Sequence, residues 1–170
     1  MEELYAVASS FLILFSIVMA IYYAIGLKRS TIAYKVFTLY LIAMAIVQSV
    51  SYYIGGVLHE NNLFMFHYYY ILQFYILTIF YYLLLHARWI PYVTVLVTSI
   101  LVWTYVRDPG VFLVYSPLGV TLTQSVLIAY IISYFYRSLS GHLRYIYINI
   151  GLFFFLITSI LVFASGNLML

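Results

Sequence analysis

The sequence predicts an all-α membrane protein, a polytopic bundle of about six transmembrane helices joined by short loops. Of the 170 residues, 67% are apolar and only 6% are charged, whereas soluble domains carry about 25% charged residues. The apolar residues form runs of about twenty, the length that a helix needs to cross a ~30 Å hydrocarbon core. Because the connections are too short for a soluble domain, residues 1–170 are expected to form a single transmembrane domain.

Six apolar runs define the predicted spans. They cover residues 5–27, 34–58, 63–85, 89–106, 116–136 and 145–165. The first run follows Glu2 and Glu3, where a cleavable signal peptide would carry basic residues, so this run is expected to remain in the mature protein. The fourth run is short and contains Pro91, which a helix tolerates in its first turn.

Two boundaries leave alternatives open. Ser116 and Pro117 predict a break before the fifth span, which makes residues 111–115 a short apolar loop at the membrane surface. A long, kinked fifth helix is the alternative. After the sixth span, the chain either ends naturally at residues 167–170 or begins a seventh span that lies beyond Leu170.

Charge predicts the orientation of the bundle. One side of the six-span arrangement carries six basic residues: Lys28, Arg29, Lys35, Arg88, Arg137 and Arg144. The opposite side carries all four acids and one basic residue: Glu2, Glu3, Glu60, Asp108 and Arg107. Because cytoplasmic loops are enriched in Lys and Arg, the side with Lys28, Arg88 and Arg137 is expected to be cytoplasmic and both termini external.

Composition argues against several functions. The chain has no cysteine, which excludes a disulfide framework, a zinc–thiolate site and an iron–sulfur cluster ligated by this chain. The basic residues form no continuous stripe, so no nucleic-acid partner is expected. No charged residue is predicted near the bilayer centre, which argues against a proton-coupled transporter, an ion pump or a voltage sensor.

Neither a catalytic residue nor a cofactor is predicted. Ser140 and His142 lie close together in a loop, but all the acids are expected on the other side of the membrane. His59, Glu60 and His67 supply too few converging ligands for a metal ion.

The strongest candidates for a binding site are polar residues inside the spans. Gln48, Gln73 and Gln124 lie at roughly 10–15 Å depth at 1.5 Å per residue. Because an amide in hydrocarbon needs partners, all three are expected to face the bundle interior. His67 and Tyr70 share a helical stripe, with Gln73 one turn beyond Tyr70.

These five side chains have two interpretations. They either form interhelical hydrogen bonds, worth about 0.6 kcal/mol each on average, or line a ligand pocket that opens to the outside. The 21 tyrosines cluster near predicted helix ends, where aromatic belts form at the membrane surface.

The stretches Glu60-Asn61-Asn62-Leu63 and Tyr70-Ile71-Leu72-Gln73-Phe74, with Gly151-Leu152-Phe153 later in the chain, resemble a pattern in uncharacterised multi-spanning membrane proteins of the Bacteroidetes. In that pattern an acid stands where this sequence has Gln73. The resemblance implies a bacterial inner (plasma) membrane location and a six- or seven-helix layout, but no activity.

Three functions are compatible with the sequence. The first is a non-enzymatic, receptor-like component or accessory subunit that binds other membrane subunits within the bilayer. The second is a transporter, or the substrate-binding subunit of one, whose outward pocket takes a small ligand or lipid. Energy-coupling-factor subunits are similar in size and helix number, but their termini are expected inside. The third, an intramembrane lipid-modifying enzyme, needs an acid or a metal that the sequence does not place.

Overall fold

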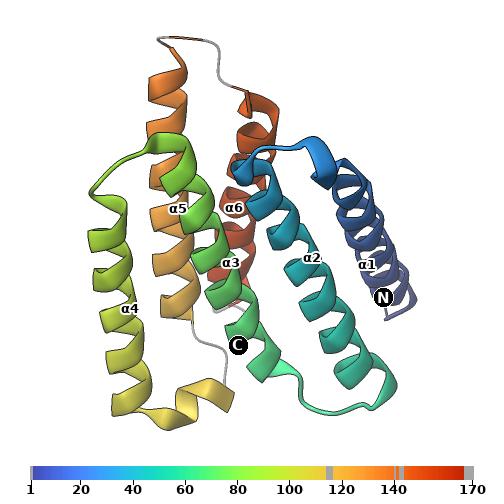
Figure 1. Cartoon of the computed structure of the whole chain (residues 1–170). Coiled ribbons are helices and arrows are strands. Elements are labelled where there is room, and N and C mark those ends of the chain that lie inside the picture. Colours follow the sequence, from blue (N-terminus) through green and yellow to red (C-terminus); the bar gives the residue numbers. More distant parts are fainter. Residues whose placement is uncertain (1, 114–116, 140, 142–143, 167–170) are drawn as a thin grey trace.

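The chain folds into a bundle of long helices, seen here in a computed structural model (Figure 1). The structure describes residues 2–113, 117–139, 141 and 144–166, with side chains between residues 10 and 161 except Arg29 and Leu113. These residues form six α-helices and no strand: α1 (Glu2–Ile25), α2 (Ile32–Tyr52), α3 (Leu63–Leu85), α4 (Ile90–Arg107), α5 (Pro117–Ser138) and α6 (Ile146–Gly166).

Five helical segments are long and apolar enough to cross a membrane. They are Ser10–Lys28, Ile32–Val57, Leu63–Leu85, Ile90–Arg107 and Pro117–Ser138, and they correspond to the first five predicted spans. The sixth predicted span, 145–165, corresponds to α6. Its side chains are described as far as Leu161, and the stretch Ile146–Leu161 is apolar.

Short helical turns of other types modify the predicted boundaries. The helix predicted over 34–58 is α-helical only to Tyr52 and then continues as the π-helical turn η2 (Tyr53–Val57), which contains Gly55 and Gly56. The loop predicted over 111–115 instead begins inside a 3₁₀ helix, η3 (Pro109–Leu113), and residues 114–116 lie outside the described residues. The helix α5 begins at Pro117, where the break was expected.

The helix α3 occupies the centre of the bundle. It packs between α2 and α5, while α6 packs on α5 (Figure 1). The side chains of Phe74, Leu77 and Phe80 on α3 are completely buried. Because lipid tails are as apolar as these side chains, van der Waals packing and interhelical hydrogen bonds hold such a bundle together within a bilayer.

The helices α1 and α4 form the two outer edges of the bundle (Figure 1). The helix α1 packs against α2, and α4 makes smaller contacts with α3 and α5. Exposed apolar side chains such as Phe11 and Val95 cover both edge helices. Such faces suit a lipid environment, in which apolar groups need no protein cover.

The connections divide between the two ends of the bundle. The α1–α2, α3–α4 and α5–α6 connections meet at the upper end in Figure 1. Lys28, Arg88 and Arg144 lie in these connections, so we call this the basic end. The α2–α3 and α4–α5 connections meet at the lower end and carry Glu60 and Asp108, so we call this the acidic end.

Candidate functional site

A cluster of aromatic and polar side chains lies near the acidic end, where α3, α4 and η3 meet. His67 and Tyr70 lie one turn apart on α3, and both are buried. The Nδ1 atom of His67 lies 3.0 Å from the Tyr70 hydroxyl and 2.6 Å from the Tyr105 hydroxyl of α4. The two hydroxyls also hydrogen-bond to each other, so three polar groups from two helices form a closed triangle.

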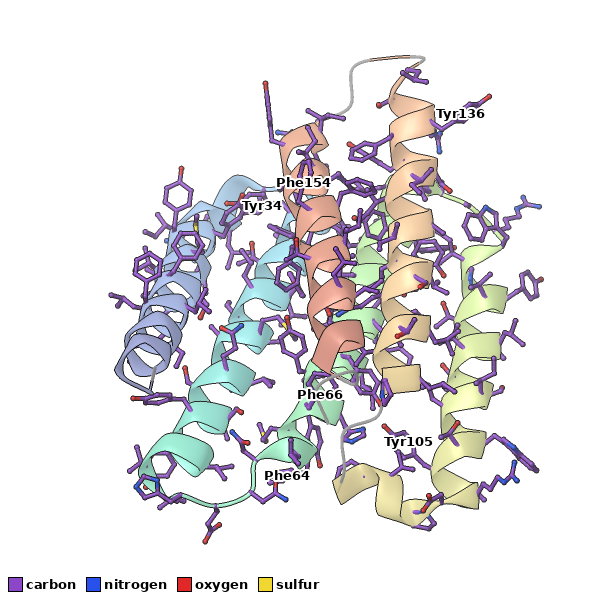
Figure 2. All side chains as sticks on the ribbon, turned by 180° about the vertical axis from the view of Figure 1, so that it is seen from behind. Tyr34, Phe64, Phe66, Tyr105, Tyr136 and Phe154 are labelled. Atoms are coloured by element: carbon purple, nitrogen blue, oxygen red, sulfur yellow. The ribbon has the colours of Figure 1, made fainter. Side chains whose placement is uncertain are left out.

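Phe112 and Gly119 complete this group, which we call the His67 cluster (His67, Tyr70, Tyr105, Phe112 and Gly119). The Phe112 ring of η3 stacks on the His67 ring, with centroids 5.2 Å apart and planes 25° apart. Gly119 of α5 lies so close to Tyr70 that a Cβ atom there would be 2.5 Å from the Tyr70 hydroxyl oxygen. Tyr105 lies in the lower part of Figure 2, close to η3.

The groups of the His67 cluster can exchange protons with one another, but they are covered. Two phenols and an imidazole can exchange protons with one another, because each hydroxyl is both donor and acceptor and Nδ1 takes either role according to the tautomer. The aromatic ring of Phe112 and the helix α5 close over these groups. The side chains therefore contact one another, and a ligand at His67 would have to displace Phe112.

A second polar contact lies deeper in the bundle. The Gln73 amide nitrogen donates to the Tyr40 hydroxyl of α2 at 3.1 Å, and both side chains are buried. The Gln73 Oε1 atom is buried and has no hydrogen-bond partner in the part of the chain that the structure describes. This amide links α2 to α3.

The other two glutamines do not join the Gln73–Tyr40 contact. The Gln124 amide donates to the Ser159 hydroxyl of α6 at 2.9 Å, which links α5 to α6. Gln48 is half-buried, and its Oε1 atom has no partner among the described residues. The prediction that the glutamines face the interior is confirmed for Gln73 and Gln124, which are completely buried.

The structure brings together two of the five candidate residues, His67 and Tyr70. Gln73 and Gln124 bond to different helices instead, so each makes an interhelical contact of its own. This arrangement corresponds to the hydrogen-bonding interpretation of the amides. Histidine, cysteine and acidic side chains form no group of three in the described residues that could hold a metal ion.

Sequence reasoning missed the polar link between α3 and α6. The Tyr81 hydroxyl donates to the Asn149 Oδ1 atom at 2.9 Å, and both side chains are completely buried. Asn149 also donates to the Tyr145 carbonyl, one turn earlier in α6. The signal was present, because Asn149 interrupts an apolar run and an amide in hydrocarbon needs partners, as the glutamines do.

A groove of about 420 Å³ lies between α1 and α2. Small side chains on both helices line it, among them Ala20, Ala24 and Ala45, and larger residues such as Ile17 and Ile46 also contribute. Ala20 and Ala45 are buried, whereas Ile17 and Ile46 are exposed. The groove is thus an apolar hollow on the surface of the bundle, away from the His67 cluster.

No protein-family model, curated protein or solved structure matches this chain.

Proposed function

We propose that this chain is a non-enzymatic accessory subunit of a membrane complex, and that a transmembrane helix of a partner protein packs into the α1–α2 groove. One observation carries the proposal, namely the apolar hollow of about 420 Å³ between these helices. Small residues at helix surfaces let a second helix approach closely, and close van der Waals packing is what drives helix association in lipid.

The polar contacts of the bundle support the same function. The amides of Gln73 and Gln124 bond to neighbouring helices, and Tyr81 bonds to Asn149. Such bonds hold the bundle in one arrangement, as a subunit that presents a fixed surface requires. The α1 helix adds an apolar surface beside the groove, with Ile21 exposed at its edge.

Photo-crosslinking in the native membrane tests this proposal. A photoreactive phenylalanine analogue at Ile21 or Ile46, both at the groove, is expected to form a discrete adduct with another protein. The matched control is Leu96, which is exposed on α4 at the far edge of the bundle. Adducts with lipid alone at the groove, or the same protein adducts at Leu96, would contradict a specific partner there.

We also propose that the chain crosses the plasma membrane six times, with the basic end cytoplasmic and both termini external. The separation of the charges supports this topology. The basic side carries six basic residues, and the other side carries all four acids with a single basic residue, Arg107. A bias of this size in short connections is the main determinant of membrane orientation.

Ligand binding at the acidic end is a second candidate function, and one observation favours it. His67 lies beneath Phe112 of the short η3 segment, so movement of that segment would uncover an imidazole and two phenols. Such a site suits a small polar molecule or lipid headgroup. Native mass spectrometry of gently extracted protein would show a bound molecule that His67→Phe removes. A ligand-free wild-type protein would contradict this function.

A further inference from the structure

A second cavity, of about 350 Å³, lies at the basic end between the start of α4 and the end of α5. Its lining combines aromatic, polar and cationic side chains: Leu85, Ala87, Trp89, Ser133, Tyr136 and Arg137. We call it the Arg137 cavity. It differs in kind from the α1–α2 groove, because Arg137 and Trp89 contribute a guanidinium-bearing and an indole side chain to its lining.

The fold positions Arg137 at this cavity. Arg137 lies in the last turn of α5, and its guanidinium donates a hydrogen bond to the carbonyl oxygen of Leu85 at the end of α3. The α3 helix ends there because His86 takes a left-handed conformation, with φ 46°. The bond to Leu85 uses one of the five guanidinium N–H groups, so the others remain for a ligand.

Charge favours an anion in this cavity. Both acidic side chains that the structure describes, Glu60 and Asp108, lie at the acidic end, at the opposite end of the bundle from Arg137. Arg88 lies in the connection just before Trp89 and adds positive charge near the cavity. A planar guanidinium binds phosphate oxygens in pairs, which makes a phosphate group the best-fitting anion.

The aromatic residues indicate where this phosphate comes from. Trp89 and Tyr136 are exposed and lie at helix ends, where aromatic rings sit level with lipid headgroups. Figure 2 shows Tyr136 at the upper end of α5, pointing away from the bundle. The Trp89 ring also packs against Tyr130, with centroids 5.4 Å apart. In the proposed transmembrane topology the cavity therefore lies at the depth of lipid phosphates, and Leu85 and Ala87 give it an apolar wall.

We propose that the Arg137 cavity binds the phosphate of an anionic phospholipid. Basic pockets between transmembrane helices are a common form of headgroup site. An anionic headgroup fits better than a zwitterionic one, because no carboxylate at this end is described that would attract the ammonium group of choline or ethanolamine. This inference does not depend on the accessory-subunit proposal, since the groove and the cavity lie on different helices.

Tryptophan fluorescence provides a direct test. The chain has two tryptophans, so Trp103→Phe leaves Trp89, in the cavity wall, as the only one. In bilayers of mixed phosphatidylglycerol and phosphatidylcholine, one lipid at a time carries brominated acyl chains, which quench nearby indole. Brominated phosphatidylglycerol is expected to quench Trp89 more strongly at equal mole fraction. The preference should be about tenfold or more, the worth of one hydrogen bond from a charged donor.

Variants separate a built site from general surface charge. Arg137→Gln is expected to abolish the preference, whereas the control Arg88→Gln, which removes a nearby charge outside the lining, should retain most of it. Equal losses in the two variants would overturn the proposal. Since Arg137→Gln also removes the bond to Leu85, Ser133→Phe provides a second variant that fills the cavity and keeps the guanidinium. Ser133→Phe should also abolish the preference for brominated phosphatidylglycerol. A full preference in this variant would show that the lipid does not bind in the cavity.

The two sources of phosphate are distinguished by competition. Inorganic phosphate is added to the bilayers that contain the protein with Arg137 intact. The reference sample has the same ionic strength but contains neither phosphate nor sulfate. The preference for brominated phosphatidylglycerol should persist, because the apolar wall contributes only to lipid binding. Loss of the preference at millimolar phosphate would assign the cavity to free phosphate and overturn the lipid proposal.

Discussion

Tyrosines of the same cluster on α3 have different environments. Tyr81 is completely buried and Tyr82 is 46% exposed; Tyr70 is 1% exposed and Tyr68 is 48% exposed. The reason is geometric, since successive residues on a helix point about 100° apart. The aromatic-belt interpretation of the tyrosine clusters is therefore wrong for Tyr70 and Tyr81, which are buried and make interhelical hydrogen bonds. For the exposed members it stays a prediction.

This difference predicts opposite results for two neighbouring substitutions. Tyr81→Phe removes the donor to Asn149 and is expected to lower the free energy of unfolding by about 1 kcal/mol, within the range of interhelical bonds in membrane proteins. Tyr82→Phe, which removes an exposed hydroxyl, should change it little. Reversible denaturation in mixed micelles measures both. Equal losses would show that the Tyr81–Asn149 bond contributes nothing of its own.

Among the helices, α3 and α5 run in the same direction and depend on one close approach. Gly119 at the start of α5 leaves the space that the Tyr70 hydroxyl occupies. Tyr70 is in turn held by its bonds to His67 and Tyr105. The glycine therefore allows α5 to pack closely on α3. At Gly151, in contrast, an added Cβ would have no atom within 4 Å among the described residues outside its own helix backbone.

Alanine at these two glycines should have different effects. Gly119→Ala is expected to destabilise the bundle by about 1–3 kcal/mol, because Tyr70 must move or the helices must separate. Gly151→Ala should be neutral or stabilising by up to about 1 kcal/mol, since glycine weakens a helix interior. Both lie in helices and add the same methyl group, so each serves as the other's control. An unchanged stability of Gly119→Ala would contradict this prediction and show that the Tyr70 side chain can move aside at little cost.

On the scale of the whole molecule, the alternation of charge follows the alternation of helix direction. Every connection at the upper end in Figure 1 carries a basic residue, and the two at the lower end carry Glu60 and Asp108. The chain has no cysteine, so single introduced cysteines report on the two ends without background. Gly110 and Gly141 are suitable positions, because both are exposed in connections that flank α5.

The proposed topology predicts one-sided labelling of these cysteines. In intact cells, a membrane-impermeant maleimide is expected to label Gly110→Cys. Gly141→Cys should react only after the membrane is permeabilised, since the basic end is proposed to be cytoplasmic. The reverse result would invert the orientation. Labelling of both from the same side would show that α5 does not cross the membrane.

Much of the fold was predictable because it depends on local properties of the chain. Apolar length determines which segments become long helices, and the structure has a helix at each of the six predicted positions. The break predicted at Ser116 and Pro117 agrees with the start of α5 at Pro117. The π-helical turn after Tyr52 and the 3₁₀ helix η3 were not predicted, because helix period and composition barely distinguish these turns from α-helix or loop.

The partners of the polar residues were decided by the tertiary structure alone. The sequence by itself predicted that Gln48, Gln73 and Gln124 would face the interior, because unsatisfied polar groups are costly in hydrocarbon. It did not show which helices pack together, so separate interhelical hydrogen bonds and a shared pocket both remained open. Packing instead places Gln73 against Tyr40, Gln124 against Ser159 and His67 against Tyr105. Apolar length and charge are properties of consecutive residues, which the sequence shows directly. Contacts between helices join residues far apart in the sequence and depend on three-dimensional packing.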